Sequence, residues 1–194
     1  MPQGAPASCP EPPGPEPDRK ATMFRNLRRK KQALTEAECR DILSRGVYGV
    51  LAVAGDDGYP YAVPVNYVLR GNTIYLHSAK TGHKIDAIAR NDKVSFCVVD
   101  KSDLVPERFT TYFKSVIAFG RARIVDNKVE SLDALTALTQ TLAPSESPDH
   151  QLEEIEQCEH AGSVAIVAID IEHLSGKQAI ELARSKTNDD TPIG

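Results

Sequence analysis

The sequence has no tryptophan, only two methionines and no long apolar run. A membrane-spanning helix needs about 20 consecutive apolar residues, so no such helix is expected. The first residues also lack the basic and then apolar order of a secretion signal. We therefore predict a cytoplasmic protein that does not contact a membrane.

An excess of basic residues is also missing, because the formal net charge is −4 at pH 7. General binding to nucleic acid phosphates is therefore not expected. One basic cluster exists, made of Arg25, Arg28, Arg29, Lys30 and Lys31. It could contact nucleic acid or acidic lipid, but we interpret it as a solvated arm over the acidic surface of the protein itself.

The four cysteines are too scattered to form a CxxC pair or a secreted-type disulfide framework. They are Cys9, Cys39, Cys97 and Cys158. We predict free thiols in a reducing compartment. Cys97 lies in the apolar stretch "KVSFCVVD" and is interpreted as a small core residue rather than a redox group.

The length of 194 residues favours one domain with one hydrophobic core. Residues 1–22 contain seven of the 13 prolines and few apolar side chains, so they are predicted to be a disordered extension. The domain is expected over residues 23–180, and residues 181–194 form a tail with no strong pattern. Whether the residues before Met23 are native is left open.

The folded part should begin with a short helix, because Thr35 and Glu38 form a T-x-x-E capping pattern. Gly46 suits a left-handed exit from that helix. Helices are also predicted over 82–91, 127–143 and 151–160 from their apolar spacing.

Six strands are expected, separated by turns or helices. They cover residues 47–53, 59–69, 73–77, 93–100, 110–125 and 163–177. Short connections favour antiparallel pairing, and the lack of βαβ alternation favours a closed or nearly closed barrel over a Rossmann sheet. Pro60 and Pro64 cannot donate ladder hydrogen bonds, so their strand should have an open edge that a ligand could use. Gly120 is predicted to mark a bend or bulge.

The stretch "IYLHSAKTGHKIDAIARN" runs from a strand into an amphipathic helix whose first turn carries His83 and Lys84. A helix amino end carries free N–H groups and partial positive charge, so phosphate or carboxylate could bind there. An ordinary helix with Thr81 as its cap and a solvated Lys84 explains the same residues. His77 ends the preceding strand; a zinc site with His83 is discounted because no third ligand has a recognised spacing.

The blocks G-Y-P-Y, H-S-A and G-H-K occur in this order within residues 49–100, followed by "FTTYFKSVIAFGRARIV". Together they resemble the flavin-binding split-barrel family related to pyridoxamine 5′-phosphate oxidase, and most of all its nitroimidazole-resistance branch. The resemblance spans approximately residues 25–177. It implies a mainly β fold, a six-stranded antiparallel split barrel of Greek-key type with peripheral helices. It also implies a homodimer that binds FMN at the subunit interface.

The resemblance further implies which residues would bind FMN. The isoalloxazine edge would lie along Val63, Pro64, Val65 and Asn66. The ribityl chain and ring would lie near His77 and Ser78, and the phosphate near His83 and Lys84. Ser115 would reach the cofactor of the partner subunit.

The sequence departs from the family pattern at two places. It has no carboxy-terminal Arg-x-His cluster, so vitamin B6 oxidation is not expected. Val63 stands where such oxidases place an arginine on the cofactor phosphate, which leaves more of that role to Lys84.

The predicted function is an FMN-dependent oxidoreductase that passes electrons from reduced flavin to a small electrophile such as a nitroaromatic compound. Flavin chemistry belongs to the cofactor, so no catalytic triad is needed. His77 would hydrogen-bond the substrate or donate a proton. No G-x-G-x-x-G motif is present for a nicotinamide dinucleotide. The alternative is a carrier or sensor that binds flavin, haem or deazaflavin without turnover.

Overall fold

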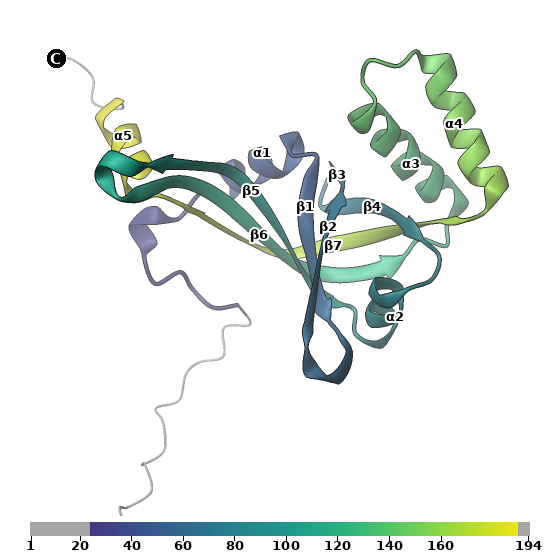
Figure 1. The fold of residues 1–194 in the computed structure, drawn as a ribbon, viewed down its shortest axis with the longest axis horizontal. Helices are drawn as coiled ribbons and strands as arrows, with labels where there is room; N and C mark the ends of the chain where they lie inside the picture. The colour runs from purple at the N-terminus through teal and green to yellow at the C-terminus, as the bar shows by residue number, and fades with distance from the viewer. Residues whose placement is uncertain (1–23, 190–194) are drawn as a thin grey trace, which may run out of the picture.

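The computed structural model describes residues 24–189 as one curled antiparallel sheet surrounded by helices (Figure 1). The strands are β1 (Tyr48–Ala54), β2 (Pro60–Asn66), β3 (Val68–Arg70), β4 (Thr73–Ala79), β5 (Lys93–Val105), β6 (Thr110–Ile124) and β7 (Val164–Gln178). Their order in the sheet is β2-β1-β5-β6-β7-β4-β3. The mainly β split-barrel prediction is confirmed. The predicted extension over residues 1–22 lies outside the described residues.

Five α-helices and three 3₁₀ turns are found in the described part of the chain. The α-helices are α1 (Glu36–Arg45), α2 (His83–Arg90), α3 (Lys128–Leu142), α4 (Pro148–Ala161) and α5 (Ile180–Asp189). The 3₁₀ turns are η1 (Lys30–Gln32), η2 (Asp56–Gly58) and η3 (Pro106–Arg108). None of the helices between residues 24 and 189 is both long and apolar enough to cross a membrane.

The sheet has seven strands instead of six because the predicted strand 59–69 breaks at Tyr67. This side chain is fully buried, and its hydroxyl donates a hydrogen bond to the Leu43 carbonyl oxygen at the end of α1 (2.8 Å). The Tyr67 backbone N–H also bonds to the Val47 carbonyl oxygen. The chain therefore turns a corner, with β2 paired to β1 and β3 paired to β4.

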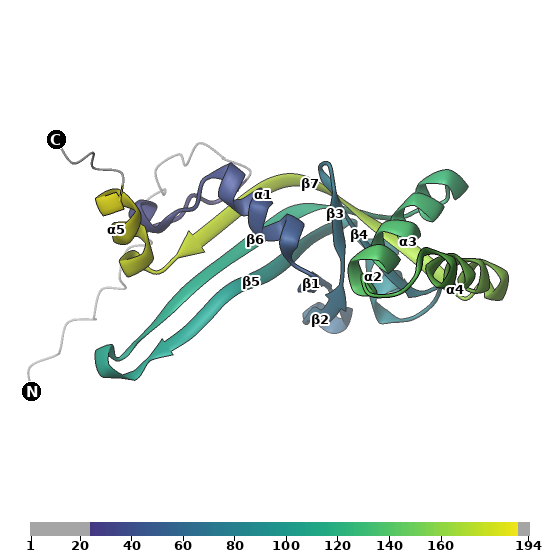
Figure 2. The same cartoon turned by 90° about the horizontal axis from the view of Figure 1, so that it is seen from above.

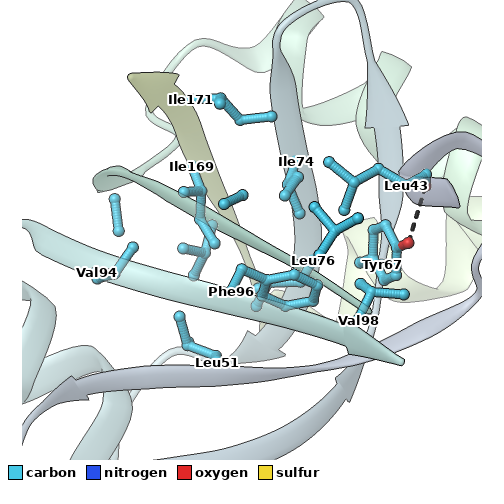
Figure 3. Packing of buried hydrophobic residues seen from close by; sticks show 14 of the residues in the cluster. Leu43, Leu51, Tyr67, Ile74, Leu76, Val94, Phe96, Val98, Ile169 and Ile171 are labelled. Atoms are coloured by element: carbon cyan, nitrogen blue, oxygen red, sulfur yellow. Dashed lines mark hydrogen bonds between the residues drawn. The ribbon is translucent and has the colours of Figure 1, made fainter. Parts of the chain in front are cut away.

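The interior of the curl holds the main apolar cluster (Figure 3), with Phe96 against Tyr67 in an edge-to-face arrangement. Both α1 and α2 contribute residues to this cluster, α1 through Leu43 and α2 through Ala87 and Ile88. The two helices therefore help to close the barrel interior. A smaller cluster lies under α3, where Leu138 packs with residues of β7.

A long β5–β6 hairpin extends away from the barrel body, together with the end of β7 (Figures 1 and 2). Its tip carries Phe109, which is 99% exposed and has a left-handed backbone conformation. Helix α5 follows β7 directly and lies near this end of the molecule in both views. The sequence pattern indicated no element after β7, so α5 was missed.

The barrel is open along a seam between β2 and β4. Among the described residues β2 is hydrogen-bonded only to β1, and β3 covers β4 only as far as Tyr75. The Cα atoms of β2 and β4 approach within 8 Å of each other across this seam. The open edge predicted from Pro60 and Pro64 is thus confirmed.

Two predictions about glycines have different outcomes. Gly120 lies at a register shift in the β6–β7 pairing, so the predicted bulge is confirmed. The predicted left-handed exit at Gly46 is wrong, because its φ is −73°. A Cβ at Gly46 would lie 2.3 Å from the Tyr67 hydroxyl oxygen, so glycine is needed there for close packing. The capping box of Thr35 and Glu38 is confirmed.

We predict that Tyr67→Phe destabilises the protein. The change leaves the buried Leu43 carbonyl without its partner, which should lower the free energy of unfolding by about 1–3 kcal/mol. Urea unfolding measures the difference. Tyr59→Phe is the matched control, since Tyr59 is 77% exposed. Equal stability of the two variants would show that the corner does not depend on this hydroxyl.

Candidate functional site

The start of α2 presents free backbone amides. Gly82 is the residue before the helix, with φ 119° and no side-chain cap, so the alternative of Thr81 as an ordinary cap is not what the structure has. The N–H groups of Ile85 and Asp86 already bond to the Gly82 carbonyl oxygen. The N–H groups that precede them in the first turn have no helical partner, as at every helix start. No atom lies within 4 Å of the point where a Cβ on Gly82 would be.

Lys84 and Ser78 meet beside this helix start. The Lys84 ammonium donates a hydrogen bond of 2.8 Å to the Ser78 hydroxyl. Ser78 is 6% exposed, while Lys84 is half-buried. Because β4 leads directly toward α2, the strand end and the helix start bring a cation, a hydroxyl and free amides together. Ser78 and Lys84, which the resemblance assigns to the ribityl chain and to the phosphate, are therefore close in space.

His83 is held by residues that the sequence analysis did not identify. Its ring stacks on Tyr61 at 4.1 Å between centroids, and its Nε2 lies 3.6 Å from the Asp56 carboxylate. Asp56 also forms a salt bridge with Arg90, seven residues further along α2. No sequence spacing could have linked a turn at residue 56 to this helix.

His83 thus faces the β1–β2 turn, and carboxylates lie on that side of the helix. Asp56 is 61% exposed at its side chain, and Asp86 is exposed in the first turn of α2. Both oppose the positive potential of the helix start. Of the two predicted phosphate ligands, Lys84 is therefore better placed than His83.

His77 and Ser78 point to opposite faces of β4, because strand side chains alternate. The Ser78 side chain is buried, whereas His77 is exposed on the outward face. His77 is paired in register with Ile166 of β7. The resemblance placed both residues beside one flavin. Because they point to opposite faces of β4, a flavin that contacts both would have to pass through the seam from the outer side of the sheet to the inner side.

The predicted residues of β2 also divide between two faces. Val63 and Val65 are half-buried and pack against the interior cluster, as does Tyr61. Pro64 and Asn66 are exposed on the outward face. The Asn66 amide donates a hydrogen bond to the Val47 carbonyl oxygen. A ring lying on the outer side of the seam could contact Pro64, Asn66 and His77 by their side chains, but Val63 and Val65 only by their backbone.

Ser115 lies far from these residues within one chain. It pairs with Val99 of β5 and with Lys177 of β7, on the same outward face as Pro64 and Asn66. Three strand spacings separate β2 from β6, or about 14 Å. One chain therefore does not bring Ser115 to the other predicted flavin residues.

The outward face of β1, β5 and β6 carries exposed apolar side chains. We call this set the apolar face. Its members are Tyr48, Val50, Val99 and Ile117, which are 65%, 38%, 56% and 36% exposed. Cys97 lies among them, half-buried, so its interpretation as a core residue is wrong. Burial raises the pKa of the Cys97 thiol above its ordinary value.

A cavity of about 680 Å³ lies on the same side of the sheet, next to the β1–β2 turn. Ala52, Ser95 and Gly120 form part of its lining, with Phe24 and Phe119 among its aromatic residues. None of the predicted flavin residues lines it. Within residues 24–189 no group of three or more His, Cys, Asp or Glu side chains could hold a metal ion.

Residues 35–178 match the family model of pyridoxamine 5′-phosphate oxidase. The chain belongs to the pyridoxamine 5′-phosphate oxidase family. The match begins at the cap of α1 and ends with β7, so it includes the whole sheet and the start of α2.

One curated relative is an uncharacterized protein of Rhizobium meliloti (strain 1021), which is 32% identical over 90 residues. This match covers 46% of the chain and 54% of the relative, so it spans about half of that protein's length.

Two solved structures have a fold similar to that of this chain. A candidate 5-nitroimidazole antibiotic resistance protein from Bacteroides thetaiotaomicron has a TM-score of 0.62 and 19% identity, over 75% of this chain and 86% of that one. An FAD-binding protein from Mesorhizobium loti has a TM-score of 0.53 and 24% identity, over 76% and 97%. At these identities the likeness shows the fold alone.

We predict that Gly82→Ala strains the start of α2. Its φ of 119° and ψ of 171° are accessible only to glycine at low cost. The variant should lose about 1–3 kcal/mol in urea unfolding. Gly162→Asn is the control, because Gly162 has an ordinary left-handed conformation that asparagine tolerates. If Gly82→Ala were as stable as this control, the described helix start would be wrong.

Proposed function

We propose that the protein is an FMN-binding oxidoreductase that passes electrons from reduced flavin to a small electrophile, with nitroaromatic compounds as the candidate acceptors. The observation that carries this proposal is the uncapped start of α2 with the Lys84–Ser78 pair beside it. Free amides, an ammonium group and a hydroxyl suit a phosphate group better than an apolar ligand. The FAD-binding protein and the candidate nitroimidazole resistance protein of similar fold support the choice of a flavin and of a nitro acceptor.

The phosphate of FMN would bind at the helix start. Lys84 would exchange its bond to Ser78 for one to a phosphate oxygen, or keep both. A hydrogen bond between charged partners contributes about 1.5–3 kcal/mol. His83 would contribute less, because Tyr61 and Asp56 hold its ring toward the β1–β2 turn.

The ring would lie on the outer side of the seam. Pro64 and Asn66 flank the seam from β2, and His77 flanks it from β4. Free carbonyl and N–H groups at the β2 edge can bond to the polar edge of an isoalloxazine ring, and the prolines ensure that no further strand pairs fully there. Ser78 and Lys84 would then bind the other end of the molecule.

When bound, the flavin supplies the electron transfer chemistry. The residues of this chain position it and limit the access of water. His77 is exposed on the outward face, where an imidazole can hydrogen-bond a substrate or donate a proton. This catalytic role depends on the substrate lying on the outer side of the ring.

The functional unit would be a homodimer. The apolar face is exposed in one chain, and large exposed apolar patches mark interaction surfaces. Pro64, Asn66 and Ser115 lie on the same face of the sheet. Packing two apolar faces together would therefore bury Pro64, Asn66 and Ser115 at the interface.

A second candidate function is flavin binding without turnover, as in a carrier or sensor. The observation that favours it is that His83 and Asp56 are already engaged with each other, which leaves His77 as the proton donor that turnover would use. Haem or deazaflavin on the same barrel would give a different absorption spectrum from flavin.

We predict that Lys84→Ala weakens FMN binding by at least tenfold, because it removes a charged bond to the phosphate. Riboflavin has no phosphate, so its affinity should change little. Fluorescence titration of both ligands measures the difference. Lys128→Ala is the control, since Lys128 is an exposed lysine at the start of α3. Equal losses for FMN and riboflavin would refute the phosphate role of Lys84.

We predict that a nicotinamide donor bleaches the FMN-loaded protein without oxygen and that a nitroaromatic acceptor restores the colour. His77→Phe should slow this recolouring by about 100-fold with normal flavin content, if the imidazole acts as a proton donor. His150→Phe, on the exposed surface of α4, is the control. Failure to recolour with any acceptor would favour the binding function.

A further inference from the structure

We propose that the cavity of about 680 Å³ beside the β1–β2 turn binds a flat aromatic carboxylate at a site separate from the flavin. The evidence is the floor of the cavity, its aromatic walls and the charges in its lining. None of the residues assigned to the flavin lines this cavity, so the inference does not depend on the proposed function.

Small side chains on the outward face of the sheet form the floor of the cavity. Ala52 of β1 pairs with Ser95 of β5, and Ser95 pairs with Phe119 of β6, so the three side chains share one face. Their neighbours Leu51 and Phe96 are buried on the inner face. Two small side chains beside a phenyl ring leave a recess in the sheet surface, and a flat ligand can lie in it.

Aromatic rings stand on two sides of this floor. On the β6 side, the ring of Phe24 lies 5.5 Å from the ring of Phe119, measured between centroids. Phe24 also stacks on His173 at 4.6 Å with the two planes 10° apart. On the β2 side, Tyr59 follows the β1–β2 turn and is 77% exposed. Aromatic rings in such positions can make offset or edge-to-face contacts with an aromatic ligand.

The charges in the lining favour an anion. Arg25 and Lys93 both line the cavity, and neither forms an ion pair with a carboxylate of residues 24–189. The carboxylate of Glu172 also lines it, but Arg121 binds this group at 2.9 Å and Asp92 at 2.8 Å. Two unpaired cations against one engaged carboxylate therefore offer charge-assisted hydrogen bonds to a ligand carboxylate.

The size of the cavity and its remaining polar group fit a small organic acid. Pockets for small molecules occupy about 300–1,000 Å³, and this cavity is within that range at about 680 Å³. The Ser95 hydroxyl has no hydrogen-bond partner among the residues that the structure describes. It can therefore bond to a polar group of a ligand that lies on the floor.

The cavity and the proposed flavin residues occupy different parts of the outward face. Phe119 is four residues beyond Ser115 along β6, which is about 13 Å. Pro60 lines the cavity, whereas Pro64 lies four residues further along β2. A dimer packed through the apolar face would leave the cavity at the edge of the contact, next to the β1–β2 turn. One chain can therefore bind both ligands at the same time.

Titration calorimetry of the full chain with 2-naphthoate tests the inference. We expect saturable binding, about tenfold tighter than that of the neutral 2-naphthamide, because the carboxylate gains a charged bond. Decanoate, a flexible acid without a ring, should bind more weakly than 2-naphthoate. The titration is repeated with excess FMN, which should leave the affinity for 2-naphthoate unchanged.

Two variants separate the charge from the floor. Lys93→Gln should weaken 2-naphthoate binding by about tenfold and leave 2-naphthamide unaffected, with Lys128→Gln on α3 as its control. Ser95→Leu fills the floor and should abolish the binding of both probes. Its control is Ser102→Leu, at an exposed position of β5 outside the lining. Urea unfolding checks that each variant is folded, and Lys93→Gln still decides if Ser95→Leu is not.

Five results would overturn the inference. A lack of saturable 2-naphthoate binding would refute the site itself, and so would unchanged binding in folded Ser95→Leu. Equal affinities for 2-naphthoate and 2-naphthamide would refute the role of charge. Decanoate binding as tight as that of 2-naphthoate would refute the preference for a flat ring. Displacement of 2-naphthoate by FMN would show that the two sites are not separate.

Discussion

The hydrogen bond between the buried Tyr67 hydroxyl and the Leu43 carbonyl oxygen is the interaction on which the rest of the architecture depends. It connects the end of α1 to the corner between β2 and β3, and the ring of Tyr67 packs on Phe96 in the barrel interior (Figure 3). Burial raises the pKa of Tyr67, so the hydroxyl keeps its proton over the physiological pH range. Because the chain turns at this corner, β2 and β3 end on opposite edges of the sheet, and the seam between β2 and β4 stays open.

Much of the fold could be predicted because local signals and burial agree. The capping box at Thr35, the edge strand with its prolines and the bulge at Gly120 each follow from one residue's chemistry. The break at Tyr67 could not be predicted, since an apolar strand pattern continues through it. Its cause is a hydrogen bond to a helix 24 residues earlier.

The site could be predicted only where its residues are close in sequence. Ser78 and Lys84 lie on either side of one strand–helix connection, and their side chains meet beside the start of α2. Asp56 and Tyr61 come from the β1–β2 hairpin, so their contacts with His83 appear only once the sheet has formed. Residues 63–66 were predicted as one group because they are consecutive in sequence. In the structure they point alternately to two faces of β2, so Val63 packs inward and Pro64 faces solvent.

The register shift in the β6–β7 pairing determines which residues at the end of β7 face outward and can meet another molecule. Glu172 has no partner in the ladder, since Gly120 pairs with Ile171 and Phe119 pairs with His173. This one extra residue inverts the parity of β7, so odd-numbered side chains face the core before it and face outward after it. A regular ladder over the same sequence would pair Glu172 with Phe119 and present Leu174 and Gly176 where Ser175 and Lys177 now stand. The surface chemistry of the strand is therefore encoded by a single backbone irregularity as much as by its side chains.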